Sequence, residues 1–341
     1  MKAAIYNPYL NTFGGGERYT LSFAEVLLNH GYDVDIQWES EEIIEPLEKR
    51  FGMKLNNINV VRDINRGDGY DLCFWVSDGS IPTLKSRKNI LHFQVPFHGV
   101  NGRSLINKMK LFRINKIVCN SIFTKNIIDE EYGVDSIVVY PPVDTLFIKP
   151  KRKESVILFV GRFSELLQSK NQDLLVKNFR KLIDNGLTEW KLIIAGGVEV
   201  GADDFLERVK KMSEGYPIEI IQSPAFNDLK ELYGKAKIFW SASGFGEDEN
   251  KNPEKVEHFG MSVVEAMTSG AVPIVFKAGG HREIINDGKN GFLWTKESEL
   301  LKITARIIKE GKLLREISAS AKEDSKLYSK EVFEKEIFKL I

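Results

Sequence analysis

The sequence contains only two cysteines and no long apolar run. Cys73 and Cys119 stand far apart among 341 residues and form no Cys-x-x-Cys pair, which argues against a disulfide framework, a thiolate zinc site and a redox dithiol. The longest apolar runs, such as 156–160, have the length of a strand and fall short of the ~18 residues that cross a bilayer. The first eight residues lack the pattern of an export signal. We therefore expect a cytoplasmic protein that contacts a membrane, at most, from its cytoplasmic face.

An excess of charge of one sign is also absent. The 48 Lys and Arg residues balance 48 Asp and Glu residues, so no overall field attracts nucleic acid, and we expect no nucleic-acid partner. With 43% hydrophobic and 28% charged residues, the composition is typical of a folded globular protein. At ~150 residues per domain, the length suggests two domains.

Short β-branched and aromatic runs alternate with amphipathic stretches, which predicts parallel sheets with helices on both faces. Pro141-Pro142 and the basic run 149–153 interrupt this pattern and indicate a linker. We expect an N-terminal domain over 1–145 and a C-terminal domain over 151–327, and the helix 328–341 is a candidate to complete the first domain. In doubly wound sheets, ligands bind outside the carboxyl ends of the strands, so function is expected in the strand-to-helix loops and in a cleft between facing domains.

The pattern predicts thirteen strands and a purely helical end after about residue 297. In the first series the expected strands are 2–6, 33–38, 59–61, 72–75, 89–93, 116–119 and 137–140. In the second series they are 155–160, 191–195, 218–221, 238–241, 272–276 and 291–293.

Three glycines, Gly14 to Gly16, follow the first expected strand and open a helix. Glycine lets the backbone approach a ligand closely, and the amides of a first helical turn suit a phosphate. A dinucleotide fold needs Gly-x-Gly-x-x-Gly, but the last position here is Tyr19. Asp33 and Asp35 lie where a ribose-binding acid would fall, so an NAD-dependent dehydrogenase remains an alternative. The same two acids match a short metal-binding motif, for which a solvated strand start is the commoner explanation.

Two cations follow the strand that opens the second series. Arg162 comes directly after it, and Lys170 lies eight residues later at the start of a helix. A planar guanidinium and a compact ammonium at the carboxyl end of a strand are suited to neutralise a diphosphate without a metal. A solvated loop is the alternative explanation.

The segment 257–270 is the most informative. Residues eight apart on a helix differ by about 80° around its axis, so Glu257 and Glu265 would not share a helical face. We therefore expect Glu257 in the preceding loop and Glu265 one turn inside the helix, which Gly270 ends. This arrangement places the amides of 259–261 at the helix mouth beside a carboxylate, where they complement sugar or phosphate oxygens.

A basic stretch, 103–116, carries Arg103, Lys108, Lys110, Arg113 and Lys116. No acidic residue lies between Gly99 and Lys116, and Leu105, Met109 and Phe112 recur at helical spacing. Two interpretations stay open. The apolar stripe packs into the core of the domain, or the helix rests on anionic lipid as a peripheral membrane contact.

Taken together, Gly15-Gly16-Glu17, Gly161-Arg162 with Lys170, and the Glu257 to Glu265 spacing with Phe259-Gly260 resemble the retaining family 4 nucleotide-sugar glycosyltransferases of the GT-B fold. The resemblance runs from about residue 1 to residue 293. Within this family, the sequence is most similar to the GDP-mannose-dependent α-1,2-mannosyltransferases of lipid-linked oligosaccharide assembly. It implies an α/β protein with two doubly wound Rossmann-like domains that face a cleft. It also implies transfer of a hexose, with mannose favoured, from GDP-mannose or a UDP-sugar to a glycan, lipid or small-molecule acceptor, with neither metal nor further cofactor.

The resemblance also assigns roles to residues. The cations would stabilise the leaving diphosphate, the loop carboxylate would hold the transferred sugar, the glycine backbone would approach the phosphates, and the helical carboxylate would bind the ribose diol. The implied catalytic residues are Arg162, Lys170, Glu257 and His92, and the implied donor-binding residues are Gly15, Gly16, Phe259, Gly260, Met261 and Glu265. A sugar-nucleotide epimerase and an inactive sugar-binding homologue remain alternatives beside the dehydrogenase.

Overall fold

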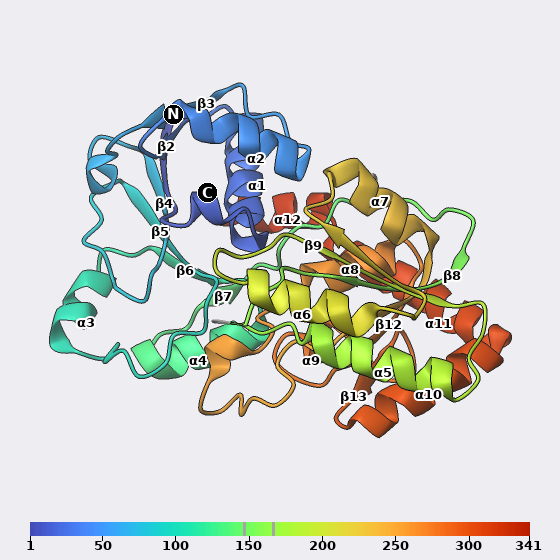
Figure 1. The fold of residues 1–341 in the computed structure, drawn as a ribbon. Helices are drawn as coiled ribbons and strands as arrows, with labels where there is room; N and C mark the ends of the chain where they lie inside the picture. Colours follow the sequence, from blue (N-terminus) through green and yellow to red (C-terminus); the bar gives the residue numbers. More distant parts are fainter. Residues whose placement is uncertain (146–147, 166–167) are drawn as a thin grey trace. The chain divides into compact units, whose positions relative to one another are not determined.

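The computed structural model describes residues 1–145, 148–165 and 168–341 (Figure 1). The chain forms two compact units, one made of Met1–Pro142 with Lys330–Ile341 and the other of Val143–Ser329. The first boundary falls at Pro141-Pro142, whose rings fix φ and remove two amide donors, so that neither a helix nor a central strand continues through it.

The first unit is built on a seven-stranded parallel sheet in the order β3-β2-β1-β4-β5-β6-β7. Its central strands are buried on both faces, as expected when helices cover both sides of a parallel sheet. Its strands are β1 (Lys2–Tyr6), β2 (Asp33–Gln37), β3 (Ile58–Val61), β4 (Leu72–Val76), β5 (Lys88–Phe93), β6 (Lys116–Cys119) and β7 (Ile137–Val138).

Helices surround this sheet, and the last helix of the chain is one of them. They are α1 (Gly15–Asn29), α2 (Ile44–Phe51), α3 (Leu105–Leu111), α4 (Ile122–Tyr132) and α12 (Lys330–Phe338), with short 3₁₀ turns at Leu10–Thr12, Glu41–Ile43 and Asn65–Gly67. Helix α12 packs on α1, where the ring of Phe333 meets that of Tyr19 edge-on at 5.1 Å. Phe333, Ile337 and Leu340 thereby join the core of the first unit.

The second unit carries a six-stranded parallel sheet in the order β10-β9-β8-β11-β12-β13. Its strands are β8 (Glu154–Val160), β9 (Lys191–Gly196), β10 (Ile218–Gln222), β11 (Ala236–Ser241), β12 (Val272–Phe276) and β13 (Phe292–Trp294). Its helices are α5 (Gln172–Asp184), α6 (Asp203–Ser213), α7 (Phe226–Lys235), α8 (Met261–Thr268), α9 (His281–Ile284), α10 (Glu297–Lys309) and α11 (Gly311–Asp324), with 3₁₀ turns at Pro253–Lys255 and Ser325–Tyr328. The large buried side chains Trp240 and Trp294 lie in its core.

The predicted fold class is confirmed: the two sheets are parallel and Rossmann-like. Every predicted strand is present, and most begin and end within one or two residues of the prediction. Strand β11 begins two residues earlier than predicted, and the strand predicted at 137–140 ends two residues early, because only Ile137 and Val138 pair with β6. Tyr140 precedes two prolines, which cannot donate to a ladder, so the strand stops early.

The structure excludes one of the two interpretations of the basic stretch 103–116. The apolar stripe of the basic stretch does not pack into the core, because none of the residues of α3 is buried. Among the described residues, no helix combines the length and the apolar composition that a membrane crossing requires.

Candidate active site

Four neighbouring strands of the second unit bring the predicted donor-side residues to one edge of its sheet. Strands β9, β8, β11 and β12 pair in parallel, so their carboxyl ends lie at the same edge. The loop after β8 carries Arg162 and Lys170, and the loop between β11 and α8 carries Glu257. Ligands of doubly wound sheets bind at this kind of edge.

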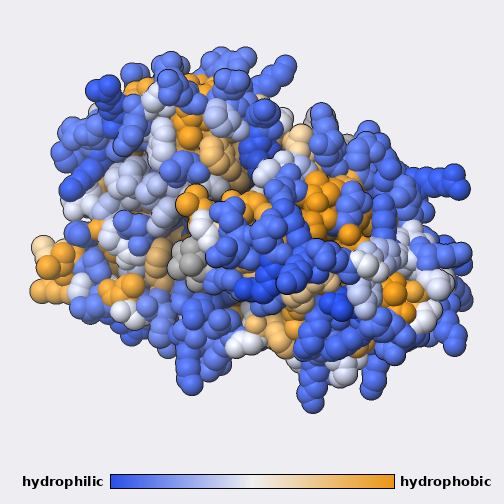
Figure 2. All heavy atoms as spheres, viewed as in Figure 1, coloured by the Kyte–Doolittle hydropathy of each residue, from blue (hydrophilic) through white to orange (hydrophobic). Residues whose placement is uncertain are grey.

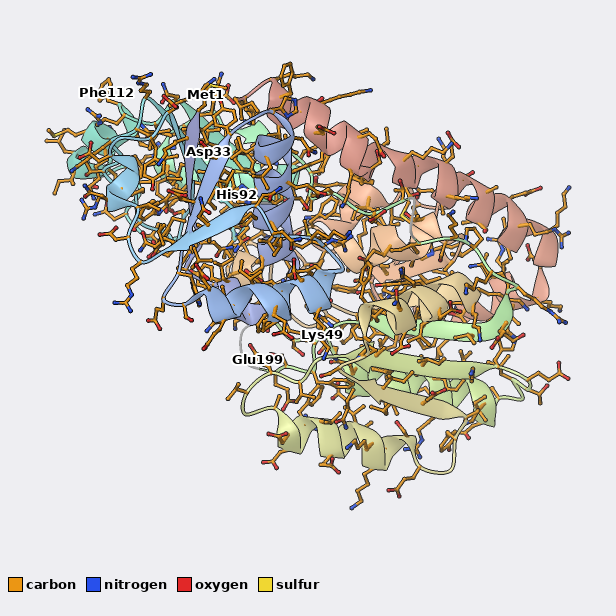
Figure 3. All side chains as sticks on the ribbon, turned by 90° about the horizontal axis from the view of Figure 1, so that it is seen from above. Met1, Asp33, Lys49, His92, Phe112 and Glu199 are labelled. Carbon is orange, nitrogen blue, oxygen red and sulfur yellow. The ribbon has the colours of Figure 1, made fainter. Side chains whose placement is uncertain are left out.

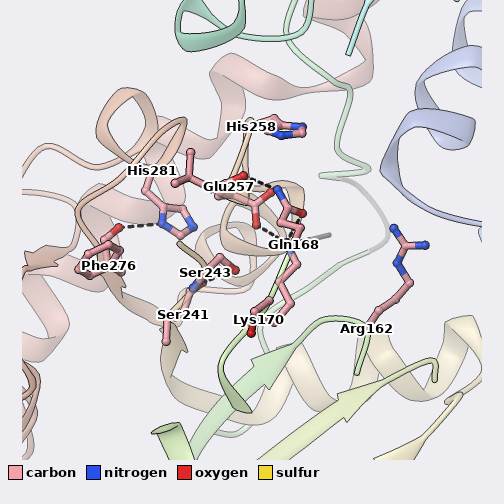
Figure 4. A network of polar contacts seen from close by, with 12 residues as sticks. Arg162, Gln168, Lys170, Ser241, Ser243, Glu257, His258, Phe276 and His281 are labelled. Atoms are coloured by element: carbon pink, nitrogen blue, oxygen red, sulfur yellow. Dashed lines mark hydrogen bonds and ion pairs between the residues drawn. The ribbon is translucent and has the colours of Figure 1, made fainter. Parts of the chain in front are cut away.

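Lys170 and Glu257 form an ion pair there (Figure 4). Their charged atoms, Nζ and Oε2, are 2.8 Å apart, and the two side chains are only 15% and 17% exposed. Lys170 Nζ also donates to Gln168 Oε1 at 2.7 Å. Burial acts to raise the pKa of Glu257, but Lys170, His281 and His258 outweigh it and hold that pKa at about 2. The pair is therefore ionised at neutral pH, with most of its surroundings closed to water.

The Lys170–Glu257 pair should contribute to stability in a pH-dependent way. Because the pKa of folded Glu257 lies at about 2, below its ordinary 4.5, the contribution is complete above pH 4.5 and is lost as the pH falls toward 2. The shift corresponds to about 3 kcal/mol. We therefore expect the difference in unfolding free energy between wild type and Glu257→Gln to shrink as the pH falls from 6 to 3. Denaturant titrations followed by circular dichroism measure this difference.

A matched control for that titration is Glu219→Gln. Glu219 pairs with Lys191 at 3.7 Å, but the side chain is 53% exposed, and surface pairs of this kind contribute little. The difference in unfolding free energy between Glu219→Gln and wild type should stay small at every pH. A gap between wild type and Glu257→Gln that keeps its size down to pH 3 would contradict the lowered pKa of Glu257.

Two residues that we did not predict fix the Lys170 loop in place. Asn171 adopts a left-handed backbone, with φ of 52°, and its Nδ2 donates to the carbonyl of Ala242 at 2.9 Å. Gln172 is buried, and its Nε2 donates to the carbonyl of Arg162 at 2.7 Å. An amide side chain on each side of the helix start thus ties the two cation-bearing turns to the sheet edge. The sequence signal for them is a polar pair directly after Lys170.

The side chain of Arg162 stands apart from the Lys170–Glu257 pair (Figure 4). Arg162 is exposed, and within the described parts of the chain its guanidinium has no ion-pair partner. Its turn lies tightly against the end of β9, because a Cβ on Gly196 would come within 1.9 Å of the carbonyl oxygen of Gly161. The backbone there is fixed, and the cation it carries is open to an anion.

Two glycines that we also did not predict hold the Glu257 loop. Gly279 and Gly280 follow β12, and the amide of Gly280 donates to the carbonyl of Glu257 at 2.8 Å. A Cβ on Gly279 would lie 2.1 Å from that same carbonyl oxygen, and one on Gly280 would lie 2.5 Å from the Cα of Phe259. Only glycine fits this close approach of two backbones. Two glycines after a buried strand are the signal that could have revealed it.

The polar segment 246–255 supports the same turn through Glu249. One carboxylate oxygen of Glu249 accepts from the amide of Gly279 at 2.9 Å, and the other pairs with Arg282 at 2.6 Å. In the structure the segment braces the glycine pair that contacts the Glu257 loop.

Helix α8 begins as expected, with Glu257 in the preceding loop and Glu265 inside the helix. Gly260 precedes the helix with φ of 113°, a backbone that glycine alone adopts without strain. Among the described residues, the amides of Gly260 and Met261 donate to no other group, while the ring of Phe259 is buried against Tyr328 at 5.3 Å. Glu265 accepts from the hydroxyl of Tyr233 at 2.7 Å. The helix mouth thus offers amide donors beside a carboxylate.

His281 lies beneath this mouth and is fully buried. Its Nδ1 contacts the carbonyl oxygen of Phe276 at 2.8 Å, and a Cβ on Gly260 would lie 3.3 Å from its ring. Burial lowers the pKa of His281, although Glu257 and the Phe276 carbonyl act in the opposite direction. At neutral pH the ring is therefore uncharged, and it forms the floor of the site.

The glycine loop lies in the first unit, at the start of α1. The Glu17 carboxylate accepts from the amide of Gly14 at 2.6 Å and from the Thr12 hydroxyl at 2.7 Å, which closes the turn. The end of the Gln94 side chain lies directly over Gly16, because a Cβ there would fall 1.9 Å from Gln94 Oε1. Gly15 and Gly16 therefore occupy the first turn of α1 with their backbone held from one side.

The expectation for His92 needs correction. The ring is fully buried in the core of the first unit (Figure 3), stacked on Tyr19 with centroids 4.2 Å apart, and its Nδ1 contacts the carbonyl oxygen of Val118 at 3.1 Å. Burial, only partly opposed by that contact, lowers the pKa of His92 to about 3. A neutral, enclosed imidazole is not placed to touch a sugar, because it lies on a strand buried on both faces.

The acids of β2 do not form a site with each other. Asp35 accepts from Asn59 Nδ2 at 3.0 Å and from the Tyr70 hydroxyl at 2.7 Å. Across the ranges that the structure describes, no group of three or more His, Cys, Asp or Glu side chains is arranged to hold a metal ion.

Comparison with known proteins shows the family of the chain. Residues 145–324, more than half of the chain, match the family model described as glycosyl transferases group 1. The chain belongs to this family. It is therefore a glycosyltransferase, which favours glycosyl transfer over the dehydrogenase and epimerase alternatives. The resemblance to GT-B glycosyltransferases that the sequence motifs indicated is thereby confirmed.

Individual relatives are distant. An uncharacterized glycosyltransferase of Methanocaldococcus jannaschii is 25% identical to this chain. The aligned region covers 81% of this chain and 76% of that protein. The human GDP-Man:Man(3)GlcNAc(2)-PP-Dol alpha-1,2-mannosyltransferase is 26% identical over 64% of this chain, which spans only 46% of that protein. The solved structure of Anabaena HepE in complex with UDP and glucose shares the fold, with a TM-score of 0.77 at 17% identity, over 99% of this chain and 98% of HepE.

Proposed function

We propose that the protein is a retaining hexosyltransferase that moves mannose from GDP-mannose to a glycan or a lipid-linked acceptor. The observation that supports it most is the Lys170–Glu257 pair at the carboxyl edge of the second sheet, with the exposed guanidinium of Arg162 on the neighbouring turn. Mannose is favoured because relatives from several organisms are GDP-mannose-dependent alpha-1,2-mannosyltransferases.

In this proposal the cations act on the leaving group. As the bond between the anomeric carbon and the phosphate oxygen breaks, negative charge grows on the diphosphate, and Arg162 and Lys170 stabilise it. Glu257 would accept from hydroxyls of the transferred sugar, and the amides at the mouth of α8 would donate to its oxygens. Glu265, which already accepts from Tyr233, would receive the ribose diol.

Retention is proposed to follow a front-face substitution. Glu257 is engaged by Lys170 and Glu265 by Tyr233, which leaves both carboxylates suited to binding rather than to attack. The acceptor oxygen would form its bond to the anomeric carbon on the face that the diphosphate leaves, and the acceptor proton would pass to the departing phosphate oxygen. The reaction then needs positioning and fixed positive charge rather than a covalent intermediate.

A donor panel tests the proposal. The full chain is incubated with GDP-mannose, UDP-glucose or UDP-N-acetylglucosamine, with a mannosyl-oligosaccharide as acceptor, and nucleotide release is measured. We expect GDP-mannose to be consumed at least about tenfold faster than either UDP-sugar, with an α-linked product by NMR. Faster turnover of a UDP-sugar would replace the donor assignment. Binding of a sugar nucleotide without turnover, even to water, would identify an inactive homologue and refute the proposal.

A further inference from the structure

The loop that carries α3 exposes an unusual concentration of large apolar side chains. Of the ten large exposed hydrophobic residues in the described parts of the chain, five lie between residues 100 and 112. Leu105 is 75% exposed, Ile106 66%, Met109 65% and Phe112 91%. Figure 2 shows hydrophobic side chains gathered where Figure 1 places α3, and Phe112 lies at the rim of the first unit in Figure 3. We call residues 99–116 the α3 loop.

The α3 loop is held firmly at its beginning. The carboxylate of Glu131 accepts from the backbone amides of Gly99, Val100 and Gly102 at 3.0 to 3.1 Å. Burial acts to raise the pKa of Glu131, but these three hydrogen bonds lower it overall. The guanidinium of Arg103 donates to the carbonyl of Glu130 through two nitrogens, at 2.9 and 2.6 Å.

The end of the α3 loop is held in the same manner. Arg113 Nε donates to the carbonyl of Leu84 at 2.8 Å, and the carbonyl of Arg113 accepts from Asn89 Nδ2 at 2.8 Å. The protruding helix is thus anchored at both ends on the first unit. The fold presents these apolar side chains to the outside, where their exposure to water is unfavourable.

The charge around the exposed side chains has one sign. The α3 loop contains five basic residues and no acidic residue. Lys108 and Lys110 lie on α3 itself, and among the described residues neither has an ion-pair partner. The carboxylate of Glu131, which contacts the start of the loop, accepts from three backbone amides. The positive charge of the loop is therefore available to an external anion.

We propose that the α3 loop rests on an anionic lipid surface, with its apolar side chains among the acyl chains and its lysines at the headgroups. A seven-residue helix is ~10 Å long, so it lies in the interface and does not cross it. Anionic headgroups attract clustered Lys and Arg. A second copy of the chain fits less well, because a two-fold contact through this loop would bring the same cations face to face. The proposal does not depend on the sugar donor.

Vesicle sedimentation of the full chain tests this surface. The vesicles contain phosphatidylcholine, with or without phosphatidylglycerol, and no glycolipid. We expect wild type to bind the anionic vesicles at least about tenfold more tightly than the neutral ones, and added salt to weaken the binding. Leu105→Ser with Phe112→Ser, and separately Lys108→Glu with Lys110→Glu, should each reduce that affinity about tenfold or more.

Matched controls separate this surface from exposure or charge in general. Val200→Ser removes an apolar side chain that is 94% exposed on the second unit, and Lys302→Glu with Lys309→Glu reverses two exposed charges on α10. Both should bind the vesicles like wild type. Equal binding by the α3-loop variants and wild type, or equal binding to neutral and anionic vesicles, would overturn the proposal. So would a dimer, seen by sedimentation velocity, that Phe112→Ser dissociates.

Discussion

Replacing Lys170 by alanine is expected to lower turnover by roughly 10²–10³, the loss typical of removing one preorganised electrostatic donor. The ammonium lies at the carboxyl edge of β8 within a polar network, 15% exposed, where its interaction with a departing diphosphate is screened less than it would be in bulk water. The KM for the donor should change less than the turnover number, because the charge that Lys170 meets is greatest in the transition state. Steady-state kinetics with the donor identified by the panel measures both quantities.

Two further variants keep the Lys170 result interpretable. Lys181→Ala removes a lysine of α5 that pairs with Glu297 at 2.9 Å but is 42% exposed, and it should leave turnover unchanged. Lys170→Ala leaves Glu257 buried without its cation, which destabilises the fold. Combining Lys170→Met with Glu257→Gln removes both charges, and this double variant should recover the thermal midpoint without recovering turnover. Wild-type turnover in Lys170→Ala would refute the catalytic assignment.

The fold could be predicted from the sequence because its signals are local. Each strand is a short run of β-branched or aromatic residues between turns, and burial of the sheet on both faces makes these runs nearly continuous. The prediction that Glu257 precedes α8 and Glu265 lies within it is confirmed, although an angle of about 80° does not by itself exclude a shared helical face. Local patterns of this kind do not depend on which parts of the chain meet in space.

The errors share a different cause. Amphipathic spacing in α3 identifies an apolar face but not what covers it, so the core-packed alternative was open until the structure showed that face exposed. Likewise, His92 sits on a strand buried on both sides, and no periodicity distinguishes a buried strand residue from one that faces a ligand. The braces at the site, such as Asn171 with Ala242 or Gly280 with Glu257, join residues far apart in the chain. Their spatial pairing is a property of the assembled sheet edge.

Gly280→Ala is expected to cost about as much activity as the loss of a catalytic group, although the residue carries no side chain. The new Cβ would lie 2.5 Å from the Cα of Phe259 and 2.6 Å from the carbonyl oxygens of His258 and Phe259. These are backbone atoms, so the 257–260 loop itself must move. A shift of about 1 Å in a positioning element can reduce a rate 10²-fold. We expect turnover to fall by roughly that factor, measured alongside the affinity for the donor.

The control for Gly280→Ala is Gly311→Ala, where the nearest atom, Nη1 of Arg315, lies 3.8 Å from the new Cβ. It should keep full turnover, and alanine in place of glycine within α11 should not lower stability. Because Gly280→Ala also risks the fold, Glu249→Gln provides a gentler change to the same loop. It keeps an acceptor for the Gly279 amide and weakens the pair with Arg282. A folded Glu249→Gln protein should therefore lose part of the activity that Gly280→Ala loses. If Gly280→Ala turned over donor at the wild-type rate, the packing of the glycine pair against the Glu257 loop would have no part in placing the carboxylate.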